Sequence, residues 1–279
     1  QIEHCLIDGQ VDDRVTTGSL EVEGMIYLDH VGVVGSSIEL LRREWQAKGF
    51  FVTEPEELMA LDPKTSRRVS LGQHSCHIIL QQGYIELTAV NAVTPSHHLF
   101  PWIRNTESLG IIAIGTNDIQ AVHARVVQAD VPAGTIARAS RPIHYGARRG
   151  DALFSWFSVG AAVTPEALIC FVRNERPELI YQPEVQRHAN GASVLESVII
   201  CAGEPESVAE RYGAYLYTTP KRVASDMFRC SLDRGVIWIG TVASIEQVFG
   251  HVVDLRPKNP PRAVGFGVAP NQICWVTSG

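Results

Sequence analysis

His30 and Glu86 carry side chains that can move a proton or bind a metal ion, and each stands inside a hydrophobic segment typical of a strand. Side chains alternate between the two faces of a strand. His30, in the segment 28–34, is therefore expected to share a face with Leu28 and Gly32. In an acid–base site, the glutamate would remove a proton next to a carbonyl group, and the histidine would donate a proton or orient the substrate.

Glu86 stands on a strand whose two faces differ in polarity. Tyr84 and Thr88 share its face, and the opposite face is apolar, with Ile85, Leu87 and Ala89. Such a strand predicts a cavity on its polar side and a covering helix on its apolar side. Because a buried carboxylate is costly without a partner, the alternative to a catalytic or metal site is a structural, hydrogen-bonded pair of His30 and Glu86.

A second group of polar residues, at 141–149, could recognise an anion. Its recognition groups are Arg141, His144, Tyr145 and Arg148. Planar guanidinium groups suit carboxylate or enolate oxygens. We predict a turn-rich loop here, and the alternative to a binding role is a solvated basic loop. The following strand carries Trp156, which either lines the same cavity or belongs to the ordinary core.

The other histidines offer weaker signals. His74 and His77 stand three residues apart on one predicted strand, so they point to opposite faces and only one can look into a cavity. His97 and His98 lie in a connection between two predicted strands, where histidines usually face solvent. We therefore expect at most one of His74 and His77 near His30 and Glu86, and we give His97 and His98 little weight.

A repeated order of elements positions these residues. The order strand, helix and three strands (βαβββ) fits residues 25–90, with a helix at about 36–48 and a second strand at 50–52. It begins again at 109, where Asn117 or Asp118 caps a helix that reaches Gln128. Further openings lie at 193, with a helix ending near 215, and at 263, where the last unit is truncated.

The repeats predict an α+β fold in which tandem βαβββ modules form curved mixed sheets. We expect an N-terminal extension at 1–23, a domain of two modules at 24–175, a proline-punctuated linker at 176–192, and a second, incomplete domain at 193–279.

The motifs Leu-Asp-His-Val-Gly-Val at 28–33 and Gly-Tyr-Ile-Glu-Leu at 83–87, with the tandem module order, resemble the vicinal oxygen chelate (VOC) superfamily in its glyoxalase-like branch. The likeness spans most of the chain. It implies a glyoxalase/dihydroxybiphenyl dioxygenase-like cup, with metal ligands on the first and last strands of each module. His30 and Glu86 match those positions, so the resemblance implies that they bind one divalent ion: Zn, Mn, Ni or Fe.

The second module departs from this pattern. Ile111 stands where a second histidine would be expected, and the closing strand offers Ile169 or Cys170 in place of a carboxylate. In the third module, Ser197 takes the histidine position. Two protein ligands hold a divalent ion weakly unless a third donor or a substrate completes its coordination.

The sequence is compatible with three functions. The first is metal-assisted or general-base lyase, isomerase or dioxygenase chemistry on a small, anionic, oxygen-rich molecule, carried by His30 and Glu86. A dioxygenase would need a further histidine from outside the pattern, such as His77, His144 or His188. The second is metal-free binding or sequestering of a small molecule, and the third is a structural or assembly role. Whether the protein is an enzyme stays open, as do its substrate and reaction.

Composition narrows the partners and the compartment. A net charge of −6 with interspersed signs gives no basic surface for nucleic acid or lipid, and no apolar run reaches the length of a membrane span. Single cysteines without paired spacing favour reduced, buried thiols and a cytoplasmic protein; they are Cys5, Cys76, Cys170, Cys201, Cys230 and Cys274. We expect a small-molecule ligand and a homodimer.

Overall fold

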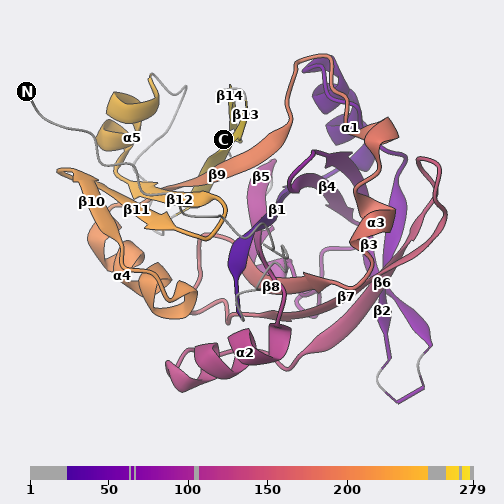
Figure 1. Cartoon of the computed structure of the whole chain (residues 1–279), viewed down its shortest axis with the longest axis horizontal. Helices are drawn as coiled ribbons and strands as arrows, with labels where there is room; N and C mark the ends of the chain where they lie inside the picture. The colour runs from indigo at the N-terminus through magenta and orange to yellow at the C-terminus, as the bar shows by residue number, and fades with distance from the viewer. Residues whose placement is uncertain are drawn as a thin grey trace, which may run out of the picture.

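The computed structural model describes residues 24–62, 64–65, 67–103, 107–250, 262–269 and 272–276. The predicted extension at 1–23 lies outside the described residues. Two sheets organise the chain, a closed eight-stranded barrel and a six-stranded sheet beside it (Figure 1). Curved mixed sheets and peripheral helices confirm the predicted α+β class.

The barrel contains the first two modules, both in the predicted βαβββ order. Its elements are β1 (Ile26–Gly35), α1 (Ile38–Ala47), β2 (Glu56–Leu61), β3 (Arg68–Ile79), β4 (Tyr84–Val90), β5 (Ser108–Thr116), α2 (Ile119–Gln128), β6 (Ala137–Ile143), β7 (Gly150–Ser158) and β8 (Leu168–Asn174). The strand order is β1-β4-β3-β2-β6-β7-β8-β5. Antiparallel β1–β5 and β2–β6 pairs join the modules and close the barrel.

One strand of the first module differs from its predicted position. The expected strand at 50–52 is wrong, because the second strand begins at Glu56. Phe50 and Val52 are buried in the core without strand pairing, and the Phe50 ring lies 5.5 Å from that of Trp45. Burial against α1 therefore explains this apolar segment.

Capping residues start both barrel helices. The Ser37 side chain accepts a hydrogen bond from Leu40 N at the start of α1. The carboxylate of Asp118, rather than Asn117, accepts one from Ala121 N at the start of α2. Such caps satisfy backbone N–H groups that have no partner within the helix.

Apolar side chains pack in one cluster outside the barrel wall and in another inside it. Outward-facing Val31, Ile85 and Leu87 join the apolar side of α1 in the largest core cluster. Inward-facing Tyr84 and Ile111 belong to a second cluster inside the barrel. The expectation that a helix covers the apolar face of the Glu86 strand is confirmed.

The six-stranded sheet repeats part of the barrel. Its elements are β9 (Val194–Cys201), α4 (Pro205–Leu216), β10 (Lys221–Ala224), β11 (Met227–Ser231), β12 (Val236–Gly240), α5 (Val242–Phe249), β13 (Arg262–Ala269) and β14 (Gln272–Trp275). β9 pairs parallel with β12 and antiparallel with β13, as β1 does with β4 and β5. The sequence predicted β9, α4, β11 and β12 but missed α5, whose first turn is capped by Thr241.

The predicted linker at 176–192 packs against the barrel. It contains α3 (Pro177–Ile180) and the 3-10 turn η2 (Pro183–Val185), and its buried residues Leu179, Ile180 and Val185 belong to the cluster inside the barrel. Its prolines begin short helical turns, and its buried residues show that part of the predicted linker belongs to the core. The proposed domain boundaries stay predictions.

No helix in the described ranges is both long and apolar enough to cross a membrane. Of the described cysteines, Cys76, Cys170, Cys201 and Cys230 are buried and Cys274 is partly buried. The prediction that the cysteines are mostly buried is confirmed for these five; Cys5 lies outside the described residues.

Candidate active site

A β-bulge in β1 positions the histidine. Leu28 pairs with Ile114 and His30 with Ala113, so Asp29 is an extra residue in the pairing of β1 with β5. A bulge re-aims the side chains around it. Leu28 therefore packs in the outer core while His30 faces the cavity, and the expectation that they share a face is wrong.

The same bulge brings two neighbouring side chains together. Asp29 Oδ2 lies 2.8 Å from His30 Nδ1, and Asn174 Nδ2 donates a hydrogen bond of 3.0 Å to Asp29 Oδ1. A carboxylate at Nδ1 favours the tautomer with its proton on that nitrogen. Nε2 is then the nitrogen of His30 available to the cavity.

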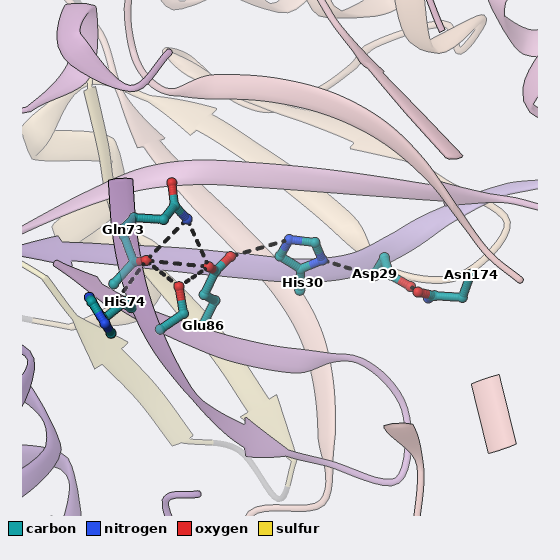
Figure 2. A network of polar contacts seen from close by, with 8 residues as sticks. Asp29, His30, Gln73, His74, Glu86 and Asn174 are labelled. Carbon is teal, nitrogen blue, oxygen red and sulfur yellow. Dashed lines mark hydrogen bonds and ion pairs between the residues drawn. The ribbon is translucent and has the colours of Figure 1, made fainter. Parts of the chain in front are cut away.

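Glu86 faces His30 across a short gap. Glu86 Oε2 lies 3.8 Å from His30 Nε2, and Figure 2 shows Asn174, Asp29, His30 and Glu86 in one chain of contacts. The His30 ring also stacks on Tyr84, with centroids 4.3 Å apart. An unprotonated imidazole nitrogen and a carboxylate oxygen would face each other with lone pairs, so a proton, a ligand donor or a cation belongs between them.

The other oxygen of Glu86 is held by neighbouring polar side chains. Oε1 accepts hydrogen bonds from Ser75 Oγ at 2.6 Å, Thr88 Oγ1 at 3.3 Å and Gln73 Nε2 at 3.4 Å. These donors offset the cost of placing a carboxylate inside the barrel. They fix Glu86 with Oε2 toward His30.

Arg141 enters the same cavity from the opposite module. The predicted loop at 141–149 is wrong at its start, because Arg141 lies on β6, pairs with Ala152 of β7 and is 3 % exposed. Its guanidinium lies over the rings of Tyr84 and Phe154, at 5.6 and 5.9 Å. Within the described chain it forms no ion pair, and its Nη2 has no hydrogen-bond partner. The barrel thus buries a cation without an anion.

The cavity has a volume of about 90 Å³, and its wall is largely apolar. Besides His30, Glu86, Gln73, His77 and Arg141, it is lined by Leu58, Leu71, Tyr84, His98, Ile111, Ala139, Phe154, Trp156, Leu168, Cys170 and Val172. A cavity of about 10–15 Å³ holds a single water molecule, so this cavity has room for a small organic molecule.

The predicted recognition residues separate into two groups. Arg141 and Trp156 line the cavity. His144, Tyr145 and Arg148 do not: His144 is exposed beside Glu56, at 2.7 Å, and Tyr145 donates to Ile180 O at 3.4 Å. Arg148 is exposed, and its Nη1 donates to Glu178 O at 3.4 Å. Tyr145 and Arg148 thus tie the β6–β7 turn to the segment that includes α3, whereas His144 contacts β2.

Two further histidines line the cavity. His77 faces inward while His74 faces outward to Asn91, so the prediction that only one of them enters is confirmed. Burial, with Arg141 and His30 nearby, lowers the pKa of His77 well below its usual value. His98 was expected in solvent, but burial lowers its pKa to about 4. The connection carrying it is anchored over the barrel by Trp102, whose Nε1 donates to Thr164 O at 2.8 Å.

The second module places less polar side chains at the positions that correspond to His30 and Glu86 of the first module. Ile111 and Cys170 line the cavity, whereas Ile169 belongs to the outer core. Burial raises the pKa of Cys170, so this thiol stays protonated at neutral pH.

The residues at the site fit a resident divalent ion only in part. His30 Nε2 and Glu86 Oε2 converge, but the described residues contain no group of three or more His, Cys, Asp or Glu side chains placed to hold a metal ion. Catalytic metal sites usually have three protein ligands. Two donors alone make a weak site.

Comparison with known proteins agrees with this architecture. The sequence profile of the family described as "Glyoxalase-like domain" matches residues 28–216. No curated protein sequence matches the chain. Among solved structures, a hypothetical protein from Staphylococcus aureus has a TM-score of 0.57 at 13% identity, covering 78% of this chain and 86% of its own. A triple mutant of 4-hydroxymandelate synthase from Streptomyces coelicolor has a TM-score of 0.50 at 13% identity, covering 88% and 71%.

Methylmalonyl-CoA epimerase from Mycobacterium tuberculosis is a more distant match, with a TM-score of 0.37 at 16% identity, covering 53% of this chain and 87% of its own. Similarity at these identities concerns the fold alone. The profile match covers most of the barrel and the start of the second sheet, and the strand order agrees with it. The chain therefore belongs to the glyoxalase-like domain family.

Proposed function

We propose that this protein is an enzyme that transfers a proton next to a carbonyl group of a small carboxylate. The observation that carries the proposal is the facing pair of Glu86 and His30, 3.8 Å apart in a cavity that also contains the unpaired Arg141. Lyase and isomerase reactions of oxygen-rich molecules use such acid–base groups.

Arg141 supports the choice of an anionic substrate. A buried cation without a counter-anion is costly, and a carboxylate can accept two parallel hydrogen bonds from a guanidinium group. Phe154, Trp156 and Leu168 of the cavity wall favour a compact apolar body next to that charge.

Glu86 is the proposed base and His30 the proposed acid. Oε1 of Glu86 is occupied by three donors, so Oε2 is free to take a proton from the substrate. Asp29 holds Nδ1–H of His30, so His30 would act as the acid in its doubly protonated form, in which Nε2–H donates its proton to the developing enolate. Asp29 and Asn174 act as positioning residues.

A divalent ion would add Lewis-acid stabilisation of the enolate when bound. This is a second use of the same pair: His30 Nε2 and Glu86 Oε2 would hold the ion in place of acting as acid and base, and the substrate would have to supply further donors. We expect Zn, Mn, Ni or Fe to stay with the protein during gel filtration only when a carboxylate ligand is present. A full equivalent of metal in ligand-free protein, lost in a His30→Ala, Glu86→Ala double variant, would contradict this two-donor site.

Proton exchange tests the proposed reaction. With 2-oxobutyrate as probe in D₂O, we expect the protein to accelerate deuterium incorporation at C3, followed by NMR. Glu86→Gln should slow this exchange by about 10²–10⁴-fold, whereas Glu196→Gln, an exposed glutamate on β9, should not change it. No acceleration with the probe bound would overturn the enzyme proposal.

The alternative is a metal-free binding protein of the same fold, favoured by Ile111 and Cys170 at two cavity positions of the second module. It predicts that carboxylate probes bind equally well to the wild type and to Glu86→Gln, without exchange in either. Dimerisation and a cytoplasmic location stay predictions; light scattering with size-exclusion chromatography tests the first.

A further inference from the structure

Three polar atoms around the cavity lack partners. They are Oε1 of Gln73, Nδ1 of His77 and Nη2 of Arg141, and their residues are 1 %, 3 % and 3 % exposed. Buried polar atoms are nearly always hydrogen-bonded, and leaving one without a partner costs about 1–3 kcal/mol. Because all three residues line one cavity, a single ligand could satisfy them together.

The orientation of the Gln73 amide is set by its neighbours. Its Nε2 donates to Glu86 Oε1 at 3.4 Å and to Thr88 Oγ1 at 3.3 Å. A flipped amide would place Oε1 against the Glu86 carboxylate, with no proton between the two oxygens. Figure 2 shows the nitrogen turned toward Glu86 and the oxygen turned away from it. Gln73 therefore offers an acceptor, and its missing partner is a donor.

The other two atoms define the rest of the ligand. Arg141 has only donors, so Nη2 calls for an acceptor, which a carboxylate supplies. His77 is neutral at pH 7, because burial and the nearby Arg141 lower its pKa. A neutral imidazole can donate or accept at Nδ1, depending on the tautomer. A group that both donates and accepts would satisfy Gln73 and His77 together.

We infer that the natural ligand is a small hydroxy-substituted carboxylate, with its carboxylate on Arg141 and its hydroxyl donating to Gln73 Oε1. This rests on the proposed function, since it uses the same cavity and the same arginine. Gln73 also holds Glu86, so recognition of the hydroxyl would place the substrate beside the proposed base.

Calorimetric titration with butyrate, 2-hydroxybutyrate and 3-hydroxybutyrate tests the inference. We expect one hydroxy acid to bind the wild type about tenfold more tightly than butyrate, as one net hydrogen bond in a dry site predicts. In Gln73→Met that advantage should disappear, while butyrate keeps its affinity. Gln46→Met, an exposed glutamine on α1, is the matched control and should retain the advantage.

The outcomes separate the two proposals. Equal binding of all three acids by the wild type would overturn the hydroxyl assignment and leave the carboxylate site intact, with no need for a folded Gln73 variant. Tighter binding of 3-aminobutyrate than of either hydroxy acid would also overturn it. If butyrate binds Arg141→Met as tightly as the wild type, Arg141 is not the carboxylate-binding residue. The proposed function is then contradicted as well.

Discussion

The interior of the barrel and the far face of the six-stranded sheet are built on the same strand pairings but have opposite characters. In the barrel, Gly32 pairs with Glu86, and in the sheet Ile199 pairs with Trp238. Ser197 thereby takes the position of His30, as the sequence predicted, and Trp238 that of Glu86. One face carries buried polar side chains inside a cavity, and the other is an apolar surface.

Helix α5 explains why this face of the six-stranded sheet is apolar. Ile245 of α5 belongs to a cluster with Ile199, Cys201 and Met227 on this face. Phe249 lies edge-on to Trp238, with ring centroids 5.8 Å apart. Figure 1 shows α5 on the outer side of this sheet, away from the barrel. A strand framework that encloses a cavity in one region thus serves as a packing surface in the other, depending on a few side chains and a covering helix.

The two regions meet at the start of β1. Asp233 Oδ2 accepts a hydrogen bond from Ile26 N at 2.8 Å, and Leu28 N donates to Arg234 O at 2.8 Å. The Arg234 guanidinium also lies 4.3 Å from the Tyr27 ring centroid. The turn between β11 and β12 therefore holds β1 directly before the bulge that aims His30.

The largest expected effect comes from making the apolar face resemble the barrel. Trp238→Glu should lower the free energy of unfolding by about 2–4 kcal/mol, because it removes the packing of Trp238 on Phe249 and places a carboxylate against the apolar cluster under α5. Urea unfolding at pH 7 measures it. Trp238→Phe, which keeps an aromatic ring, should cost less than about 1.5 kcal/mol. A loss below 1 kcal/mol in Trp238→Glu would show that the face tolerates a carboxylate.

Acid should weaken the barrel through His98. Its folded-state pKa is about 4 against the usual 6.5, so between these values the unfolded chain binds a proton that the folded protein does not. Stability is therefore retained above pH 6.5 and lost as the pH falls toward 4, by about 3 kcal/mol at most. The free energy of unfolding, measured with urea between pH 7 and 4, should depend less steeply on pH in His98→Gln than in the wild type. An identical slope in the variant would refute the assignment to His98.

Removing the unpaired cation should stabilise the ligand-free barrel. Arg141→Met replaces a buried charge by an apolar side chain, and we expect a gain of about 1–2 kcal/mol together with loss of carboxylate binding. Thermal unfolding and titration with butyrate measure the two effects. Arg148→Met, at an exposed arginine of the same segment, should change neither by more than about 0.5 kcal/mol. Destabilisation of Arg141→Met would mean that Arg141 has a structural role.

The smallest effect concerns the junction. Asp233→Ala removes the acceptor of Ile26 N and should cost about 1 kcal/mol. Hydrogen exchange should speed up at the amides of Ile26 and Leu28 but not in β11. Asp226→Ala, on another exposed turn of the same sheet, is the control. Unchanged exchange at Ile26 would show that the turn does not hold β1.

Much of the architecture was predictable from local patterns. Alternation along 84–88 placed Glu86 with Tyr84 and Thr88, and capping residues located α1 and α2. The three-residue spacing of His74 and His77 correctly excluded two inward histidines. Each of these features depends on the periodicity of a strand or a helix, which a single segment contains within itself.

Other features could not be predicted from single segments, because they depend on contacts between distant parts of the chain. Arg141 sits in a cluster of polar residues that resembles a loop, and only pairing with β7 makes it part of β6. His98 belongs to a polar connection that packs over the barrel because of a distant contact of Trp102. Helix α5 was missed because it is short and apolar and follows β12 closely.

The sequence by itself determined the repeated modules, the family and the faces of the regular strands β3 and β4, because these follow from chain order and side-chain periodicity. Tertiary structure alone decided the chemistry of the site. The bulge at Asp29 arises from the register between β1 and β5, and it joins Asp29 to His30 although strand alternation would separate them. The approach of Arg141 likewise depends on closure of the barrel, which brings residues of two modules into one cavity.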